Sequence, residues 1–403
     1  MIQVSETEIN PKLTPECNIG TLGHVSHGKT TLVSALTGKI TLTHSEELKR
    51  GITIRLGYAD ATIYKCAKCG KYTTFTKCPY CFSEAEIVRT VSFVDAPGHE
   101  TLMATVLTGT SLMDGGLFII AANEKVPQPQ TKEHLAVLEI AGIKNTIIIQ
   151  NKVDLVSPEQ AMKNYEEIKE FISGTILDKS PVIPLSAQHR VNIDVLLGAI
   201  EKYIPTPERP EGAEPKMLVA RSFDVNRPGI VPKKVVGGIL GGAIMSGKFS
   251  VGDRVELRPG VRIGNNYKPL FTKIVGLQKA GKNLDTASAG GLLGMMTSLD
   301  PSLTKSDSLV GNLVGLPGKL PESTDTISMK VDYLNNSQAP HIKVGETLLI
   351  NLGTARSVGT VTNVKKQVVE MKLKIPICAQ EKDKIAISIQ IAGRWRLAGY
   401  GII

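Results

Sequence analysis

Apolar runs and amphipathic stretches alternate along the first half of the chain. The runs with the length of strands lie at residues 91–94, 117–121, 146–149 and 182–185. Helix-like patterns separate them, at residues 130–141, 158–177 and 192–203. Continuously apolar strands that alternate with amphipathic helices are typical of a mostly parallel sheet covered on both faces. The pattern therefore predicts an α/β domain from about residue 17 to residue 203.

The pattern changes after residues 204–215, which contain four prolines and several charges and are typical of a linker. Beyond it, short β-branched stretches recur between Gly, Pro and Asn turns, at residues 218–223, 235–239, 252–257, 271–277, 327–331, 347–351, 359–364, 368–373 and 385–391. Few helical patterns interrupt them. We expect two antiparallel β-barrels, with the break between them near residues 317–322.

Composition and charge narrow the class of protein. The chain has 403 residues, of which 42 % are hydrophobic and 21 % charged, values typical of a globular protein. Neither an apolar run of about 20 residues nor a signal-peptide pattern is present, so we expect a cytoplasmic protein without membrane contact. A net charge of +9 with 4 % aromatic residues favours contact with a phosphate backbone over base stacking as the main mode of any nucleic-acid binding.

A complete phosphate-loop motif follows a predicted strand at residues 18–22 and precedes a predicted helix at residues 31–36, which is the context in which this motif binds nucleotides. Its residues are Gly23, His24, Val25, Ser26, His27, Gly28, Lys29 and Thr30, with Thr31 next in the helix. Backbone N–H groups and the positive end of a helix can hold a triphosphate. Lys29 supplies a charge for the terminal phosphates, and Thr30 supplies a hydroxyl for Mg²⁺.

A second strand end, Asp95-Ala96-Pro97-Gly98, supplies further groups for this site. Asp95 can hold the shell of Mg²⁺ through water, and the N–H of Gly98 can detect the γ-phosphate. Thr53 can complete the Mg²⁺ shell when the γ-phosphate is bound, although an ordinary strand threonine is the alternative. His99 follows Gly98, and we expect it to orient the attacking water; the alternative is a surface histidine.

Two later strand ends predict a guanine pocket. Asp154 can accept hydrogen bonds from guanine N1–H and N2–H₂, which adenine lacks, so an unpaired Asp154 would penalise adenine. Asn151 can brace the pocket, and the Lys152 stem can cover the base. After the next strand, Ser186 and Ala187 can place a backbone N–H near guanine O6.

Four of the six cysteines form two C-x-x-C pairs, Cys66 with Cys69 and Cys78 with Cys81. This spacing predicts a closed, structural Zn²⁺ site in a knuckle at residues 64–83, with a redox dithiol pair as the alternative. Four lysines surround this site and either contact a partner or only keep the knuckle solvated: Lys65, Lys68, Lys71 and Lys77. The other two cysteines, Cys17 and Cys378, are expected to be buried.

Together the motifs at residues 23–30, 50–54, 95–99 and 151–154 resemble the translational GTPases of the elongation factor Tu group. The zinc insert and the stretches at residues 44–51, 127–131, 221–229 and 393–397 narrow the resemblance to the family of gamma subunits of archaeal translation initiation factor 2. The resemblance covers nearly the whole chain. It implies a GTP-binding G domain at residues 1–208 followed by β-barrel domains at residues 209–319 and 320–403.

The resemblance also implies a function. It implies a slow GTPase, stimulated by partners, that delivers initiator methionyl-tRNA to the small ribosomal subunit and hydrolyses GTP to GDP on start-site selection. It implies an alpha subunit on the second domain and a beta subunit on the G domain. By the same resemblance Val25 and Ile52 flank the catalytic water, and the methionylated end of the tRNA lies near Arg221 and Phe223.

The chain departs from the family pattern at two places. Ser26 stands where the family usually has an aspartate that can help hold a second magnesium ion, so we do not carry that ion over to this chain. Residues 335–341 form a shorter segment than the family's equivalent. Alternative functions are a related carrier (elongation factor Tu or a selenocysteine-specific factor, neither expected to have this knuckle), a constitutive nucleotide-binding module, and a ribosome-assembly GTPase.

Overall fold

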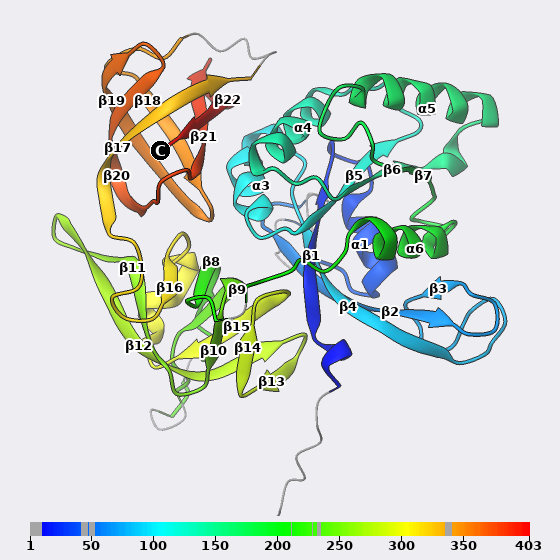
Figure 1. Ribbon diagram of the computed structural model, residues 1–403, viewed down its shortest axis with the longest axis horizontal. Helices are drawn as coiled ribbons and strands as arrows, with labels where there is room; N and C mark the ends of the chain where they lie inside the picture. Colours follow the sequence, from blue (N-terminus) through cyan, green and yellow to red (C-terminus); the bar gives the residue numbers. More distant parts are fainter. Residues whose placement is uncertain are drawn as a thin grey trace, which may run out of the picture.

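The computed structural model describes residues 10–41, 47, 53–210, 212–227, 229–231, 235–334 and 341–403 (Figure 1). Within these residues a helix-covered sheet comes first and two barrels follow. Ile52, which is expected to flank the catalytic water, lies outside the described residues. So do most of the sequence stretches at residues 44–51 and 335–341.

The first sheet has seven strands in the spatial order β3-β2-β4-β1-β5-β6-β7. The segment from β4 to β7 is parallel, whereas β2 pairs with β4 and β3 with β2 in antiparallel fashion. This confirms the mostly parallel sheet. The strands are β1 (Pro15–Leu22), β2 (Gly57–Cys66), β3 (Tyr72–Thr73), β4 (Ala85–Asp95), β5 (Gly115–Ala121), β6 (Thr146–Asn151) and β7 (Val182–Pro184).

Helices cover both faces of this sheet because its central strands are apolar on both sides. On one face α1 and α6 pack on side chains such as Ile19, Leu117 and Ile149, and on the other α3, α4 and α5 pack on Leu22, Phe118 and Ile148. The helices are α1 (Lys29–Thr37), α3 (Met103–Thr110), α4 (Pro129–Ala141), α5 (Pro158–Ile172) and α6 (Ile193–Tyr203), with 3-10 turns η1 (Pro11–Leu13), η2 (Glu100–Leu102) and η3 (Val153–Leu155).

The second part of the chain forms a barrel through β8, β9, β11, β12, β15 and β16, with β13 added at β12 and a separate β10–β14 pair. The extra pairing of β11 with β12 joins the two ends of the sheet and closes it. Its elements are β8 (Lys216–Phe223), β9 (Ile239–Ser246), β10 (Lys248–Ser250), β11 (Arg254–Ile263), β12 (Asn266–Lys279), β13 (Lys282–Leu284), β14 (Thr286–Ser288), β15 (Leu292–Thr297), η5 (Pro301–Asp307) and β16 (Leu313–Gly315).

The third part is a closed six-stranded barrel in the order β17-β20-β19-β18-β21-β22. Its interior is apolar, with side chains such as Met329, Leu348 and Ile387 fully or almost fully buried. The strands are β17 (Ser323–Tyr333), β18 (Thr347–Leu352), β19 (Ala355–Lys365), β20 (Val368–Cys378), β21 (Lys384–Ile391) and β22 (Arg394–Ile402).

Two details of the expected elements are wrong. The helix expected to reach residue 177 ends at Ile172, because Gly174 takes a left-handed conformation (φ 70°) just beyond it. The strand expected at residues 235–239 begins only at Ile239, because Gly237 and Gly238 lie against the backbone of Thr297 and the side chain of Thr304. The pattern also gave no signal for β15 or β22.

The three parts contact one another through buried side chains. Ala386 and Leu397 of the last barrel belong to the core under α3 and α4, and Arg396 pairs with Glu133 of α4 at 3.0 Å. Leu112, after α3, packs on Ala220 and Ala243 of the first barrel. The nucleotide-binding motifs therefore sit on a sheet that both barrels contact.

Candidate functional site

The phosphate loop lies tightly against the ends of β5 and β6. A Cβ on Gly23 (φ 133°) would lie 2.1 Å from the carbonyl oxygen of Ile119, and one on Gly28 (φ 92°) would lie 2.2 Å from Nδ2 of Asn151. Both positions thus need glycine for conformation and for space. Ser26 also has a positive φ, 61°, and its side chain is exposed.

Lys29 is the buried charge of this loop. Its Nζ donates hydrogen bonds to the carbonyl oxygens of Gly23 at 2.8 Å and His24 at 2.7 Å. Burial lowers the pKa of Lys29 to about 8, and the charge of Asp95 offsets this only in part. A Cβ on Gly98 would lie 2.3 Å from Lys29 Nζ, so the structure brings the two predicted γ-phosphate groups together.

The three groups expected around Mg²⁺ also meet. Thr30 Oγ1 lies 2.9 Å from Thr53 Oγ1 and donates to Asp95 Oδ2 at 2.8 Å. Thr41 and Thr21 donate to the same carboxylate at 2.6 and 3.0 Å. Burial raises the pKa of Asp95, and the threonine hydroxyls oppose the rise. Two hydroxyls and a carboxylate are hard oxygen ligands, so this set fits Mg²⁺.

The predicted guanine residues form one surface beside the loop. The Asn151 amide donates to the carbonyl oxygen of His27 at 2.8 Å and accepts from the backbone N–H of Ala187 at 3.0 Å. Lys152 takes a left-handed backbone conformation (φ 63°). A hydrogen bond from the Ser186 hydroxyl lowers the pKa of Asp154, whose Oδ2 lies 3.6 Å from His189 Nε2.

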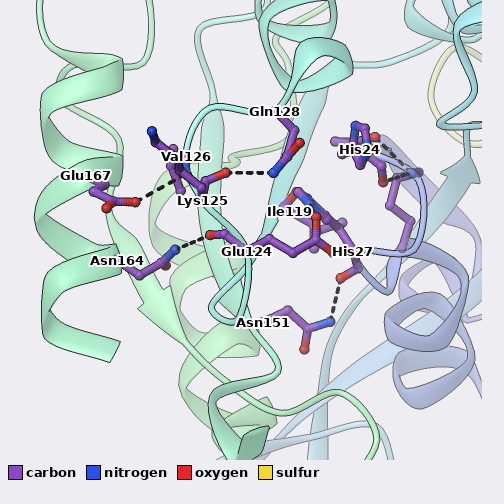
Figure 2. A network of polar contacts seen from close by, with 12 residues as sticks. His24, His27, Ile119, Glu124, Lys125, Val126, Gln128, Asn151, Asn164 and Glu167 are labelled. Atoms are coloured by element: carbon purple, nitrogen blue, oxygen red, sulfur yellow. Dashed lines mark hydrogen bonds and ion pairs between the residues drawn. The ribbon is translucent and has the colours of Figure 1, made fainter. Parts of the chain in front are cut away.

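Behind the loop, a polar network links it to α5 (Figure 2). His27 contacts the Ile119 carbonyl at 3.0 Å through Nδ1 and Glu124 at 3.3 Å through Nε2. The Glu124 carbonyl accepts from Asn164, and Glu167 accepts from the backbone N–H of Val126 at 3.2 Å. A cavity of about 400 Å³ lies between these segments. Sequence spacing gives no signal for such contacts, because the partners come from different strands and helices.

Burial controls the charge of the histidines in this network. It lowers the pKa of His27 to about 4, although the Ile119 carbonyl and the Glu124 carboxylate both raise it. His134 of α4 accepts a hydrogen bond from the N–H of Gly23 at 2.8 Å, and burial holds its pKa well below the ordinary value. The His134 side chain is therefore neutral at pH 7, as an acceptor of a backbone N–H must be.

The residues expected to act in catalysis are less buried than Asp95 at the expected Mg²⁺ site. His99 is exposed, and its Nδ1 accepts from the backbone N–H of Thr101 at 3.3 Å and lies 2.9 Å from the Thr101 hydroxyl. Val25 is half-buried in the phosphate loop. Ile52 lies outside the described residues, so of the two side chains expected to flank the catalytic water only Val25 is described.

The four knuckle cysteines converge at the turn between β2 and β4. Their Sγ atoms lie within 4.8 Å of one another, with Cys66–Cys81 at 3.4 Å and Cys69–Cys78 at 3.5 Å. Tetrahedral Zn–S bonds of about 2.3 Å place sulfurs about 3.8 Å apart, so the donor set fits Zn²⁺. A hydrogen bond from the Ser83 backbone lowers the pKa of Cys81 to about 6, which favours the thiolate that binds metal.

The pKa of the Cys69 thiol is shifted in the opposite direction. The Lys71 backbone amide lowers its pKa, but partial desolvation and its contacts with the other three cysteines outweigh this and raise it to about 12. Four neighbouring thiolates repel one another unless a cation lies among them, which is a second reason to expect a metal here.

The two residues expected near the tRNA end lie on β8. Arg221 Nε pairs with Asp307 at 2.9 Å, and Phe223 is 37 % exposed. Asp307 also accepts from the Ser222 N–H at 3.0 Å and lies 3.7 Å from Arg55, two residues after Thr53. Arg55 and Asp307, for which the sequence pattern gave no signal, thus connect the segment at Thr53 with the first barrel.

Two family models match the chain. The model of the elongation factor Tu GTP binding domain matches residues 14–206, and that of the C-terminal part of initiation factor eIF2 gamma matches residues 323–403. The regions between them are the linker and the first barrel.

Relatives and solved structures extend these matches over nearly the whole chain. The translation initiation factor 2 subunits gamma of Pyrococcus horikoshii and Methanocaldococcus jannaschii are each 55 % identical over 96 % of this chain and 97 % of their own. A bacterial selenocysteine-specific elongation factor, EF-Sec, is 25 % identical with a TM-score of 0.74, over 96 % of this chain and 58 % of that one. The Methanococcus maripaludis elongation factor SelB, at 21 % identity with a TM-score of 0.73 over 97 % and 79 % of the two chains, shares the fold.

The helices of the described residues bear on membrane contact as well. None of them combines the length and apolar character that a bilayer crossing requires.

Proposed function

We propose that this chain, which belongs to the family of archaeal translation initiation factor 2 gamma subunits, binds initiator methionyl-tRNA in its GTP-bound state and delivers it to the small ribosomal subunit. Membership of the family rests on 55 % identity over 96 % of the chain. It makes the chain a GTP-binding initiation factor with GTPase activity. The tRNA, the partner subunits, the metals and the residue roles given below are the proposal.

The phosphates of GTP would lie on the loop at residues 23–30. Lys29 now bonds two backbone carbonyls, and it can turn its ammonium to the β- and γ-phosphates without leaving the loop. An anion there stabilises the charged form of a lysine whose pKa burial has lowered to about 8. Gly98 lies close enough for its N–H to report whether the γ-phosphate is present.

Thr30, Thr53 and, through water, Asp95 would hold Mg²⁺. The ion, when bound, neutralises charge on the phosphates as the bond to the γ-phosphate breaks. Thr53 reaches this cluster from the segment between α1 and β2, while Thr30 lies in helix α1 and Asp95 ends strand β4. Loss of the γ-phosphate would therefore release Thr53 first.

Guanine would lie on the surface made by Asn151, Lys152, Asp154, Ser186 and Ala187. Asn151 uses both ends of its amide on the protein, so its role is to fix the loop and the Ala187 turn in register. This leaves Asp154 to select guanine over adenine. The Ser186 hydroxyl lowers the pKa of this carboxyl group and thus further stabilises the ionised form that guanine would contact.

Hydrolysis would transfer the γ-phosphoryl group to a water molecule and leave GDP. We assign the orientation of that water to His99, with Val25 and Ile52 restricting its access. The His99 ring bonds only Thr101 among the described residues. A group that must still turn toward the water is consistent with a slow intrinsic reaction that partners stimulate.

The single observation that supports tRNA control by GTP is the chain of contacts from Thr53 to Arg221. Arg55 and Arg221 share the carboxylate of Asp307. A switch segment that releases Thr53 also shifts Arg55, which changes the charge balance at Arg221 and thus the surface where the methionylated acceptor end would bind. We further propose an alpha subunit on the first barrel, a beta subunit on the G domain, and a cytoplasmic location.

Protection of methionyl-tRNA from deacylation tests this proposal. The complete heterotrimer is incubated with initiator or elongator methionyl-tRNA in the presence of GTP or GDP. We expect protection of the initiator form with GTP and much weaker protection with GDP. Asp307→Asn should narrow the difference between GTP and GDP, whereas Asp325→Asn, at an exposed pair on β17, should leave it unchanged. Equal protection with both nucleotides would contradict the proposal.

A further inference from the structure

The two halves of the zinc knuckle repeat one backbone conformation. In each half the residue after the second cysteine donates its N–H to the carbonyl of the first, from Gly70 to Cys66 and from Phe82 to Cys78, both at 2.9 Å. Both residues have a positive φ, 71° for Gly70 and 59° for Phe82. The same position of each turn therefore requires a left-handed backbone conformation. Glycine occupies this position in the first turn and phenylalanine in the second.

Phenylalanine is a costly choice at this position. Its Cβ is crowded in the left-handed region, which bulky residues rarely occupy and glycine enters freely. Packing does not compensate, because Phe82 is 81 % exposed. Backbone strain of this kind persists chiefly where the side chain has a function.

The surroundings indicate what the ring could bind. Residues 61–83 contain five aromatic residues and four lysines but no aspartate or glutamate, in a chain that is only 4 % aromatic. Phe75 and Tyr80 are also exposed, at 50 % and 47 %. Lys71 lies over the Tyr80 ring at 3.7 Å and pairs with Asp194, whereas Lys68 and Lys77 have no side-chain partner among the described residues.

We propose that this knuckle surface, defined as Phe75, Tyr80 and Phe82 with Lys68 and Lys77, binds a single-stranded RNA segment. Exposed rings stack on nucleobases, and the ammonium groups contact phosphates, which is the recurring combination in proteins that bind single strands. A protein partner would be better served by a continuous apolar surface than by rings interspersed with unpaired cations. The inference is independent of the nucleotide site, which lies elsewhere on the sheet (Figure 1).

The test uses the full-length, zinc-loaded chain and a 12-nucleotide strand of mixed A and U with a 5′-hydroxyl and a 3′-fluorescein. Fluorescence anisotropy gives the affinity for this strand and for the same strand in a duplex, whose bases are not free to stack. We expect the single strand to bind more tightly. Displacement by unlabelled initiator tRNA or by RNA of the small ribosomal subunit supports the surface and identifies the natural source of the strand.

Phe82→Gly separates binding from folding, because glycine is what the turn geometry prefers. We expect it to weaken the single strand about tenfold, equivalent to about 1.4 kcal/mol, with zinc content unchanged and amide protection of the knuckle equal or higher. Phe82→Trp should restore affinity, and Phe82→Leu should not. Phe271→Ala, which removes an exposed ring of β12 that is 64 % accessible, is the matched control and should bind as the parent chain does.

The lysines are tested through salt. The double change of Lys68 and Lys77 to alanine should reduce the slope of log affinity against log salt by about 1.4, since each phosphate contact on a single strand contributes about 0.7. Unchanged affinity in Phe82→Gly, full affinity in Phe82→Leu, or equal binding of strand and duplex would overturn the proposal. If these variants lose a partner subunit but keep their affinity for RNA, the proposal is overturned as well, and the surface is assigned to a protein partner.

Discussion

The nucleotide site and the zinc knuckle belong to the same sheet but are held together in different ways. Around the nucleotide site, Asp95 is completely buried and accepts three threonine hydroxyls, and Asn151 uses both ends of its amide on the protein. The knuckle between the end of β2 and the start of β4 has instead four thiols and exposed rings. The first region is ordered by its own contacts, whereas we propose that the second is ordered by a bound metal.

This difference teaches where each region can tolerate change. A preorganised site loses function when one buried partner is removed, because the remaining partner is left unsatisfied. A metal-ordered turn tolerates changes at its exposed positions but not among its ligands. The two regions should therefore respond independently to the perturbations below.

Removing zinc should have the largest effect and should be confined to the knuckle. Structural Zn²⁺ contributes about 10–16 kcal/mol to the order of small domains. We expect chelation, or Cys78→Ser, to abolish amide protection at residues 64–84 while the affinity for GTP changes less than about twofold. Metal analysis, hydrogen exchange and calorimetry measure this; Cys378→Ala, outside the cluster, is the control. A parallel loss of GTP binding would show that the regions are coupled.

The second effect in size should be on catalysis alone. His99→Ala removes the group assigned to the water while leaving the buried contacts of the site intact, so single-turnover hydrolysis with small ribosomal subunits should fall about 100- to 10,000-fold. The affinity for GTP should remain that of the parent chain. His341→Ala, at an exposed position of the last barrel, is the matched control. Parent-like phosphate release by the His99 variant would remove His99 from the mechanism.

The third effect sharpens the description of the nucleotide site. Asp154→Ala removes the carboxylate assigned to guanine, and we expect GTP affinity to fall about 10- to 100-fold while ATP affinity stays as low as before. Zinc content should not change. Asp178→Ala, at an exposed position after α5, serves as control in the same titration calorimetry. If the variant still prefers guanine by the parent ratio, the base is read elsewhere.

The smallest effect is a loss of stability at acidic pH. The folded chain lowers the pKa of His27 from 6.5 to about 4, so between these values the unfolded chain binds more protons. The contribution of His27 to the free energy of unfolding is thus fully present above pH 6.5, and it falls as the pH drops toward 4. From pH 7.5 to 5.5 the loss is about 1 kcal/mol, and His134 adds to it in the same direction.

Hydrogen exchange at α1, corrected for the intrinsic effect of pH on exchange, measures this loss. His27→Gln should flatten part of the slope, while His341→Gln should retain the parent slope. A slope that is unaffected by His27→Gln would mean that the acid response comes from other groups.

Much of the fold and of the nucleotide site could be predicted from local pattern. The alternation of strands and helices, the phosphate loop and the C-x-x-C pairs are short-range features whose spacing carries their geometry. Helix ends and strand starts were less predictable: the end of α5 depends on a left-handed glycine, and the start of β9 depends on how Gly237 and Gly238 meet a strand about 60 residues away. Contacts such as His134 with Gly23 have no local signature at all.

The amino-acid sequence by itself determined the chemistry, because residue type and spacing decide which groups can hold a phosphate, a guanine or a metal. Only the tertiary structure decided how those groups are connected. It tied Arg55 and Arg221 to one carboxylate of Asp307 and left the Phe82 ring in solvent on a strained turn. The physical reason is that pairing and exposure depend on segments distant in the chain, which meet only when the sheet and the barrels have packed.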